Sequence, residues 1–164
     1  MFTTVDSICN AGFERFYTIS QLWNSPKMIP DVCGIYLIIN PTASTPVFLP
    51  VGSGGSHKGK NPNVPLSLLQ ERWIAECRVL NVGKAGGAGY QTTLRKRLGN
   101  YLAFGQGKPR AHWGGRLIWQ LEQHPELLVA WKTMRTEDPR LAEEQIIEEI
   151  RVYYGRRPFA NLVG

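Results

Sequence analysis

The chain has 164 residues, 43% of them hydrophobic and 20% charged, which is the composition of one folded domain of ordinary size. Its longest apolar run, residues 35–39, is too short to cross a bilayer, and the polar N-terminus lacks the basic and apolar regions of a signal peptide. We therefore expect a single domain over 1–164 that is cytoplasmic and has no membrane partner. Three cysteines without CxxC spacing indicate neither a disulfide framework nor a zinc site.

The formal net charge of +6 is concentrated in one segment. Residues 84–116 contain seven Lys or Arg and no Asp or Glu, whereas the rest of the chain holds 12 basic and 13 acidic residues. A positive face attracts polyanions through counterion release, so nucleic acid is the first partner to consider. On charge alone, a solvated basic helix and loop is the alternative interpretation.

The first half of the chain predicts few regular elements. Residues 1–30 are expected to form a helical or irregular lead-in packed on the edge of the domain. The apolar run 34–39 predicts a buried strand, and 46–51 predicts a second, shorter one.

A Gly-rich stretch of about 41–73 follows the first strand. Its loop, 52–62, has the composition of a mobile surface segment, and residues 65–73 predict a short helix. The loop is either a connector or a lid over bound polyanion, and the candidate contacts in the second case are His57, Lys58 and Lys60.

The second half predicts a strand over 78–82, a helix over 92–104 and a strand over 127–134. A last helix over 139–154 is favoured because Asp138 suits its N-cap and a proline and a glycine suit its two ends. The fold class expected is α/β: a small central mixed or antiparallel sheet of about three strands, flanked by helices.

Five short segments carry the candidate chemistry. In chain order they are Gly34-Ile35-Tyr36, Asn81-Val82-Gly83-Lys84-Ala85, Leu94-Arg95-Lys96-Arg97-Leu98-Gly99-Asn100-Tyr101, a glutamate in the last helix, and Pro158-Phe159-Ala160-Asn161. Together they resemble the GIY-YIG nuclease family over roughly 34–161, most closely its single-domain bacterial members. The second motif departs from the family, because Asn81 stands where a tyrosine is usual. The stretch 41–73 then corresponds to an insertion.

The resemblance implies a compact sheet in which Tyr36 and position 81 lie on neighbouring strands and face a cleft. It also implies hydrolysis of DNA phosphodiester bonds with one Mg²⁺ or Mn²⁺ ion. In such an enzyme Tyr36 would accept the proton of the attacking water or orient that water. Because a free tyrosine has a pKa of about 10, the first role needs a nearby cation such as Lys84 or the metal. The alternative is a tyrosine that simply fills the core.

The same resemblance assigns Arg97 to the phosphate, since a guanidinium can bind two phosphate oxygens at once. Tyr101 lies four residues later on the same helix edge and would assist Tyr36 or the phosphate, or else serve as a core residue. Asn161 would brace the site through hydrogen bonds, and its alternative is an ordinary turn asparagine.

The metal-binding carboxylate is expected in the last helix. Family glutamates precede an apolar pair three and four residues later, and Glu143 precedes Ile146 and Ile147 in this way. Helical spacing also puts Glu143 on the apolar stripe, where an unpaired carboxylate is costly and a hard cation is a suitable partner. Glu144 is the first alternative, and Glu149 is the second.

Further contacts with nucleic acid are expected from basic residues outside the motifs. Besides the three residues of the Gly-rich loop, these are Arg95, Lys96, Lys108, Arg110, His112 and Arg116. The leading hypothesis is thus a metal-dependent DNA endonuclease. Its rival, motivated by Asn81, is a nucleic-acid-binding module of the same fold with impaired catalysis. RNA is not excluded as the partner of either.

Overall fold

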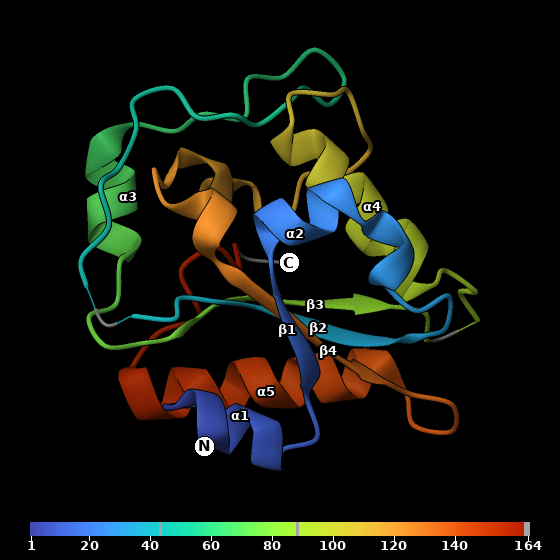
Figure 1. Ribbon diagram of the computed structural model, residues 1–164. Helices are drawn as coiled ribbons and strands as arrows, with labels where there is room; N and C mark the ends of the chain where they lie inside the picture. The colour runs from blue at the N-terminus through green and yellow to red at the C-terminus, as the bar shows by residue number, and fades with distance from the viewer. Residues whose placement is uncertain (43, 88, 163–164) are drawn as a thin grey trace.

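The computed structural model describes residues 1–42, 44–87 and 89–162, and these form three layers (Figure 1). Four strands in this part of the chain build one antiparallel sheet in the order β1-β4-β2-β3. The strands are β1 (Glu14–Thr18), β2 (Gly34–Ile39), β3 (Val79–Ala85) and β4 (Leu128–Thr133). β3 therefore lies at one edge of the sheet.

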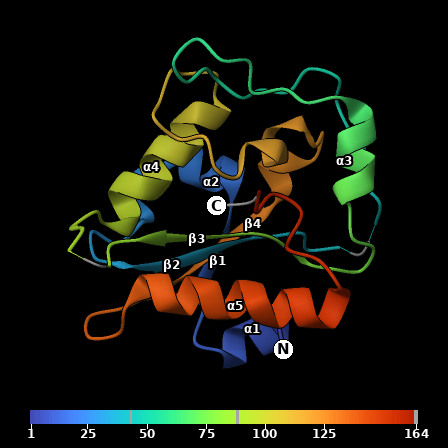
Figure 2. The same ribbon diagram turned by 180° about the vertical axis from the view of Figure 1, so that it is seen from behind.

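Helices cover both faces of the sheet, as the two opposite views show (Figures 1 and 2). One face carries α1 (Val5–Asn10) and α5 (Pro139–Tyr154). The other carries α2 (Ile19–Asn24), α3 (Leu66–Arg72), α4 (Leu94–Gly105) and the short 3-10 helices Pro26–Met28, Arg116–Gln120 and His124–Glu126. None of the helices in the described part of the chain combines the length and apolarity that a bilayer crossing demands.

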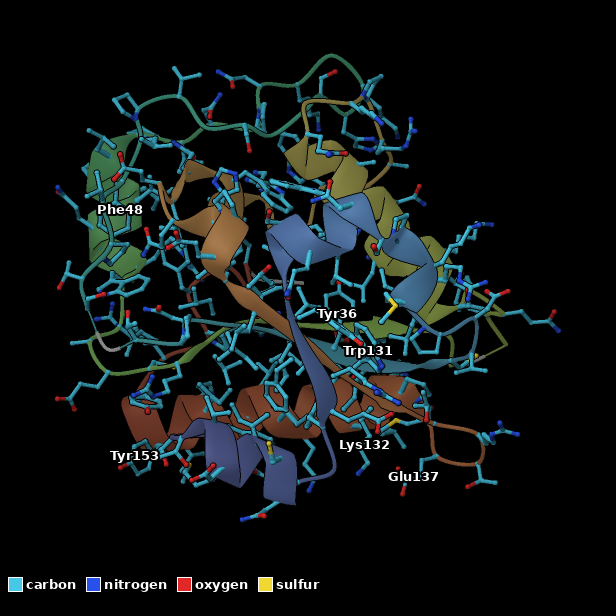
Figure 3. All side chains as sticks on the ribbon, viewed as in Figure 1. Tyr36, Phe48, Trp131, Lys132, Glu137 and Tyr153 are labelled. Atoms are coloured by element: carbon cyan, nitrogen blue, oxygen red, sulfur yellow. The ribbon has the colours of Figure 1, made fainter. Side chains whose placement is uncertain are left out.

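Strand β2 is buried along its whole length because both faces of the sheet are covered. Its side chains alternate between two cores, as the pleat of a strand requires. Ile35 and Leu37 pack on the side of α1 and α5, whereas Tyr36 and Ile38 pack on the side of α2 and α4. Tyr36 and Trp131 of β4, both labelled in Figure 3, belong to this second core.

The last helix begins and ends at the predicted residues. The Asp138 side chain accepts a hydrogen bond from the Arg140 N–H at 2.9 Å, and Gly155 ends the helix in the left-handed conformation with φ of 79°. Ile146, Ile147 and Ile150 bury its apolar face against the sheet.

The predicted α/β class is confirmed, with four strands instead of about three.

The additional strand is β1, which lies in the predicted lead-in 1–30. Its alternation of exposed and buried residues is broken, because Arg15 has φ of 63° and the pairing with β4 shifts between Glu14 and Tyr17. Such a bulge removes the period of two that identifies a strand in sequence. The lead-in therefore contributes part of the sheet, besides α1 and α2.

The predicted strand over 46–51 is wrong. Only Phe48 forms a bridge there, to Leu121, within the described residues. Pro46 and Pro50 flank this bridge and have no N–H to donate to a ladder. The helix expected over 65–73 is present as α3, and the strands expected over 78–82 and 127–134 are present as β3 and β4.

Candidate active site

A pocket of about 740 Å³ opens along the edge strand β3. Its walls come from β2, β3, the loop between β3 and α4, one residue of α4, the loop after α4, the start of α5 and the C-terminal segment. Eight of the residues singled out in the sequence line it: Tyr36, Asn81, Lys84, Arg97, His112, Arg116, Glu143 and Asn161. Segments that are far apart in the chain thus meet at one place.

Tyr36 lies directly opposite Gly83 in the pairing of β2 with β3. A Cβ atom at Gly83 would overlap the phenol ring, so the missing side chain leaves the space that the ring fills. The two motifs are therefore complementary in shape: the tyrosine of the first requires the glycine of the second.

The phenol of Tyr36 is protonated at neutral pH. Burial raises the pKa of Tyr36 to about 12 and the charge of Glu143 adds to this, while the charge of Arg97 and its hydrogen bond to Tyr36 act in the opposite direction. The cation that lowers the pKa of Tyr36 is thus Arg97, where the sequence had suggested Lys84. A neutral phenol can orient a water molecule by a hydrogen bond.

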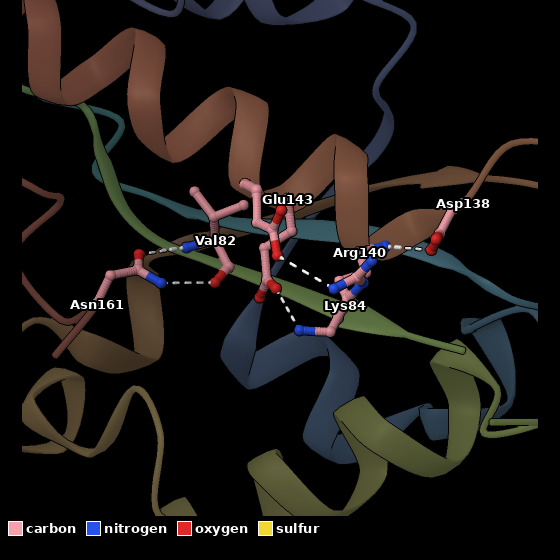
Figure 4. A network of polar contacts seen from close by, with 7 residues as sticks. Val82, Lys84, Asp138, Arg140, Glu143 and Asn161 are labelled. Carbon is pink, nitrogen blue, oxygen red and sulfur yellow. Dashed lines mark hydrogen bonds and ion pairs between the residues drawn. The ribbon is translucent and has the colours of Figure 1, made fainter. Parts of the chain in front are cut away.

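Lys84 instead forms an ion pair with Glu143 of α5 (Figure 4). The Glu143 side chain is only 16% exposed. Glu144 points to solvent with 60% exposure and pairs with Arg140 at 3.9 Å, and Glu149 lines a separate hollow. Of these three carboxylates, Glu143 is therefore the one that reaches the pocket.

Asn161 holds the free edge of β3 (Figure 4). Its side-chain oxygen accepts a hydrogen bond from the Val82 N–H, and its nitrogen donates to the Val82 carbonyl, both at 2.8 Å. The Ala160 N–H also donates to the Leu80 carbonyl at 2.8 Å. The C-terminal segment thus satisfies edge groups of β3 that would otherwise be exposed, and Asn161 acts as a brace.

Asn81 is 4% exposed and lines the pocket beside Gly115. Gly115 has φ of 76°, and a Cβ there would lie 3.0 Å from Asn81 Nδ2 and 2.9 Å from Tyr101 Oη. The loop after α4 therefore comes close to position 81 because residue 115 has no side chain.

Tyr101 lies behind the pocket wall and is absent from its lining. Its fully buried hydroxyl donates to the Gly115 carbonyl at 2.8 Å, and burial raises its pKa well above the usual value. Its ring centroid is 6.2 Å from that of Tyr36. Because this hydroxyl is already bonded to the loop, Tyr101 supports the pocket without facing it.

His112 is a neutral group in the pocket wall. Its ring packs on Tyr101 with 4.6 Å between centroids, and its Nδ1 has no hydrogen-bond partner among the described residues. Burial lowers the pKa of His112 to about 3, and the charge of Arg97 contributes, against a hydrogen bond with the Gly114 backbone. It therefore adds no positive charge to the pocket wall.

The remaining basic residues expected to contact nucleic acid lie outside the pocket lining. They are Arg95, Lys96, Lys108, Arg110, His57, Lys58 and Lys60. Arg95 is bound to the protein itself, since its Nε donates to the Ile29 carbonyl at 2.9 Å. His57 lies near the pocket wall, with its ring centroid 6.3 Å from that of Trp113.

Several pocket residues were missed in the sequence. The guanidinium carbon of Arg116 lies 4.3 Å from the centre of the Trp113 ring. Both residues line the pocket, so this tryptophan is part of its wall. Arg140 also lines the pocket and precedes Glu143 by three residues, so helical spacing could have indicated it. Tyr90 gives no such signal, because it lies in the glycine loop after β3.

Among the described residues, the pocket suits a hard divalent cation only through the carboxylate of Glu143. Within the described part of the chain, no group of three His, Cys, Asp or Glu residues is placed to hold a metal. Of the residues that the structure describes in the pocket lining, Glu143 alone has a carboxylate side chain. Mg²⁺ is often bound through one or two carboxylates, with water and substrate phosphate as its other ligands, and Glu143 suits that mode.

Comparison of the chain with protein-family models, with curated proteins and with solved structures gives no match.

Proposed function

We propose that this protein is a metal-dependent endonuclease of the GIY-YIG type that hydrolyses phosphodiester bonds of DNA. One observation carries the proposal: residues from all five motif segments line one pocket at the edge of β3. The pocket is also rich in positive charge, since Lys84, Arg97, Arg116 and Arg140 line it and Glu143 is the only acidic side chain that the described residues place there. A cleft of this charge favours a polyanionic substrate.

In this proposal Arg97 binds two oxygens of the scissile phosphate and stabilises the charge that develops there. Tyr36 keeps its own proton in the free protein and orients the attacking water. A Mg²⁺ or Mn²⁺ ion held at Glu143 would neutralise negative charge on the phosphate. Asn161 keeps β3, and with it Lys84, in register with the rest of the pocket.

The second candidate is a nucleic-acid-binding module that has lost catalysis. Two observations favour it: Asn81 stands in place of the second tyrosine, and Lys84 already satisfies the carboxylate of Glu143. An amide cannot take up a proton as a phenolate can, although it can hydrogen-bond water or phosphate. The positive pocket would serve such a module equally well.

A nicking assay separates the two candidates. Supercoiled plasmid is incubated with the purified protein and Mg²⁺ or Mn²⁺, and single-stranded RNA serves as a second substrate. We expect metal-dependent nicking of DNA that falls about a hundredfold or more in Glu143→Ala and in Arg97→Ala. Glu144→Ala and Lys96→Ala are the matched controls, because both side chains lie on the same helices outside the pocket.

Wild-type protein that binds plasmid but never nicks it would overturn the endonuclease in favour of the binding module. Nicking that survives both pocket substitutions would overturn the assignment of the site. The variant Asn81→Tyr then tests the departure from the family motif. Activity that arises only in this variant would identify the native chain as a binder.

A further inference from the structure

A second positively charged hollow lies outside the pocket, between the end of α3 and the turn that follows α5. Its volume is about 270 Å³, and it is lined by Glu71, Arg72, Arg156 and Arg157. Figure 2 shows this region, where the C-terminal end of α5 lies near α3 and the chain then rises toward the sheet. None of the five motif segments contains these arginines.

Three guanidinium groups share this hollow with one carboxylate. Within the described residues, none of the three forms a salt bridge, whereas Arg140 and Arg151 of α5 each have a glutamate partner. Burial lowers the pKa of Arg72, and the charges of Arg156 and Arg157 lower it further. The hollow thus holds an excess of positive charge that an anion would relieve.

Not all of the donors are free. Arg72 is used by the protein: its Nε donates to the Phe159 carbonyl at 2.9 Å, and a terminal nitrogen donates to the Asn161 carbonyl at 3.1 Å. Arg156 donates to the Glu71 backbone carbonyl. The Nε of Arg157 is buried and has no partner among the described residues. Donors for a ligand therefore remain mainly on Arg157 and on the second terminal nitrogen of Arg156.

The hollow and the pocket share one wall. Arg72 binds the main chain of segment 158–161 from one side, while the Asn161 side chain of that segment lines the pocket. A polyanion bound in the pocket would meet this second positive hollow on the other side of segment 158–161. Isolated anions have no such continuity, so the arrangement favours a repeating phosphate backbone.

We propose that the arginine hollow binds a second phosphate group of the nucleic acid whose backbone enters the pocket at β3. The inference rests on the proposed function, since it takes nucleic acid as the ligand. Arginine suits this role because its planar guanidinium presents parallel N–H donors to phosphate and is more weakly hydrated than an ammonium group.

The test measures binding in the absence of divalent metal. Fluorescence anisotropy of a labelled DNA duplex gives Kd for wild type, Arg157→Gln and Arg157→Lys over a range of salt concentrations. We expect Arg157→Gln to weaken binding by roughly tenfold and to reduce the slope of log K against log salt by about 1. Arg157→Lys keeps the charge but loses the parallel donors, and we expect it to recover only part of the affinity.

Arg151→Gln is the matched control, because Arg151 precedes Arg157 by six residues, is exposed and already pairs with Glu148. Equal losses in Arg151→Gln and Arg157→Gln would reduce the effect to general charge and overturn the inference. So would full recovery in Arg157→Lys. Arg72 is not substituted, since it also holds the segment that carries Asn161.

A second measurement locates the ligand directly. The Nε–Hε signals of the arginines are followed by NMR during addition of inorganic phosphate and, separately, of the duplex. We expect both to shift the Arg157 signal saturably, with the duplex acting at lower concentration; a signal that moves with neither overturns the inference. Failure of metal-dependent cleavage with these binding results intact would overturn the proposed hydrolysis alone. Normal cleavage with an unchanged salt slope would overturn the hollow alone.

Discussion

Lys84 on β3 forms an ion pair with Glu143 on α5. This pair joins the edge strand of the sheet to the helix that covers the face opposite α4 (Figure 1). Among the described residues, this carboxylate is the single acidic side chain in a pocket lined by four Lys or Arg side chains. While the pair is intact, Glu143 cancels one positive charge. Its removal should therefore affect binding and cleavage in opposite directions.

We expect Glu143→Gln to lower metal-dependent nicking about a hundredfold or more while DNA binds at least as tightly as to wild type. The amide removes a cation ligand, but it also releases Lys84 and makes the pocket more positive. Anisotropy without metal and nicking with metal measure the two effects. In the control Glu144→Gln, nicking should stay within a fewfold of wild type. Weaker DNA binding by Glu143→Gln would mean that Glu143 serves mainly to position Lys84.

Gly83→Ala should expel the Tyr36 ring from its place. The new Cβ overlaps that ring, and overpacking of a core site typically costs about 1–3 kcal/mol. Because Tyr36 lines the pocket together with Arg97, nicking should fall together with stability. The matched control is Gly99→Ala in α4, where a Cβ meets nothing within 4 Å and removal of a helical glycine should stabilise by about 0.5–1 kcal/mol. Urea unfolding measures both values, and unchanged stability of Gly83→Ala would contradict the close packing.

Local patterns made much of this fold predictable. The apolar run of β2 predicts a buried strand from a few consecutive residues. In the same local way, Asp138, Pro139 and Gly155 predict the two ends of α5. Glu143 could be singled out for the same reason, since its place on the apolar stripe of α5 depends only on helical spacing.

Other features depend on contacts between distant segments. β1 was missed because the left-handed backbone at Arg15 disrupts its alternation. The ion pair of Lys84 with Glu143 spans 59 positions, and the contact of Arg72 with Phe159 spans 87. No sequence periodicity encodes contacts between segments so far apart. The ion-pair partners within the pocket could therefore be identified only from the structure.

Asn161→Ala should destabilise the protein by about 1–3 kcal/mol, because it leaves the N–H and the carbonyl of Val82 without partners at a half-buried edge. Asn24→Ala is the control. Asn24 makes one exposed hydrogen bond, to the Ser20 carbonyl at 3.2 Å, and its loss should cost less than about 0.5 kcal/mol. Hydrogen exchange of the Val82 amide gives a local readout, and protection that survives Asn161→Ala would contradict the bracing role.

The buried imidazole of His112 should make the protein less stable in acid. Its pKa is about 3 in the folded protein against 6.5 as the ordinary value, and burial is the main cause, with the charge of Arg97 acting in the same direction. Between these two pH values the unfolded chain binds a proton that the folded protein does not, so stability falls as pH falls from 6.5 toward 3. The loss reaches about 2 kcal/mol at pH 5.

Urea unfolding of wild type and His112→Gln at pH 7 and pH 5 isolates this contribution, because His124 titrates in both proteins and cancels in the difference. Equal pH dependence of the two proteins would mean that His112 is accessible to protons in the folded state, and then it could meet a phosphate as a cation.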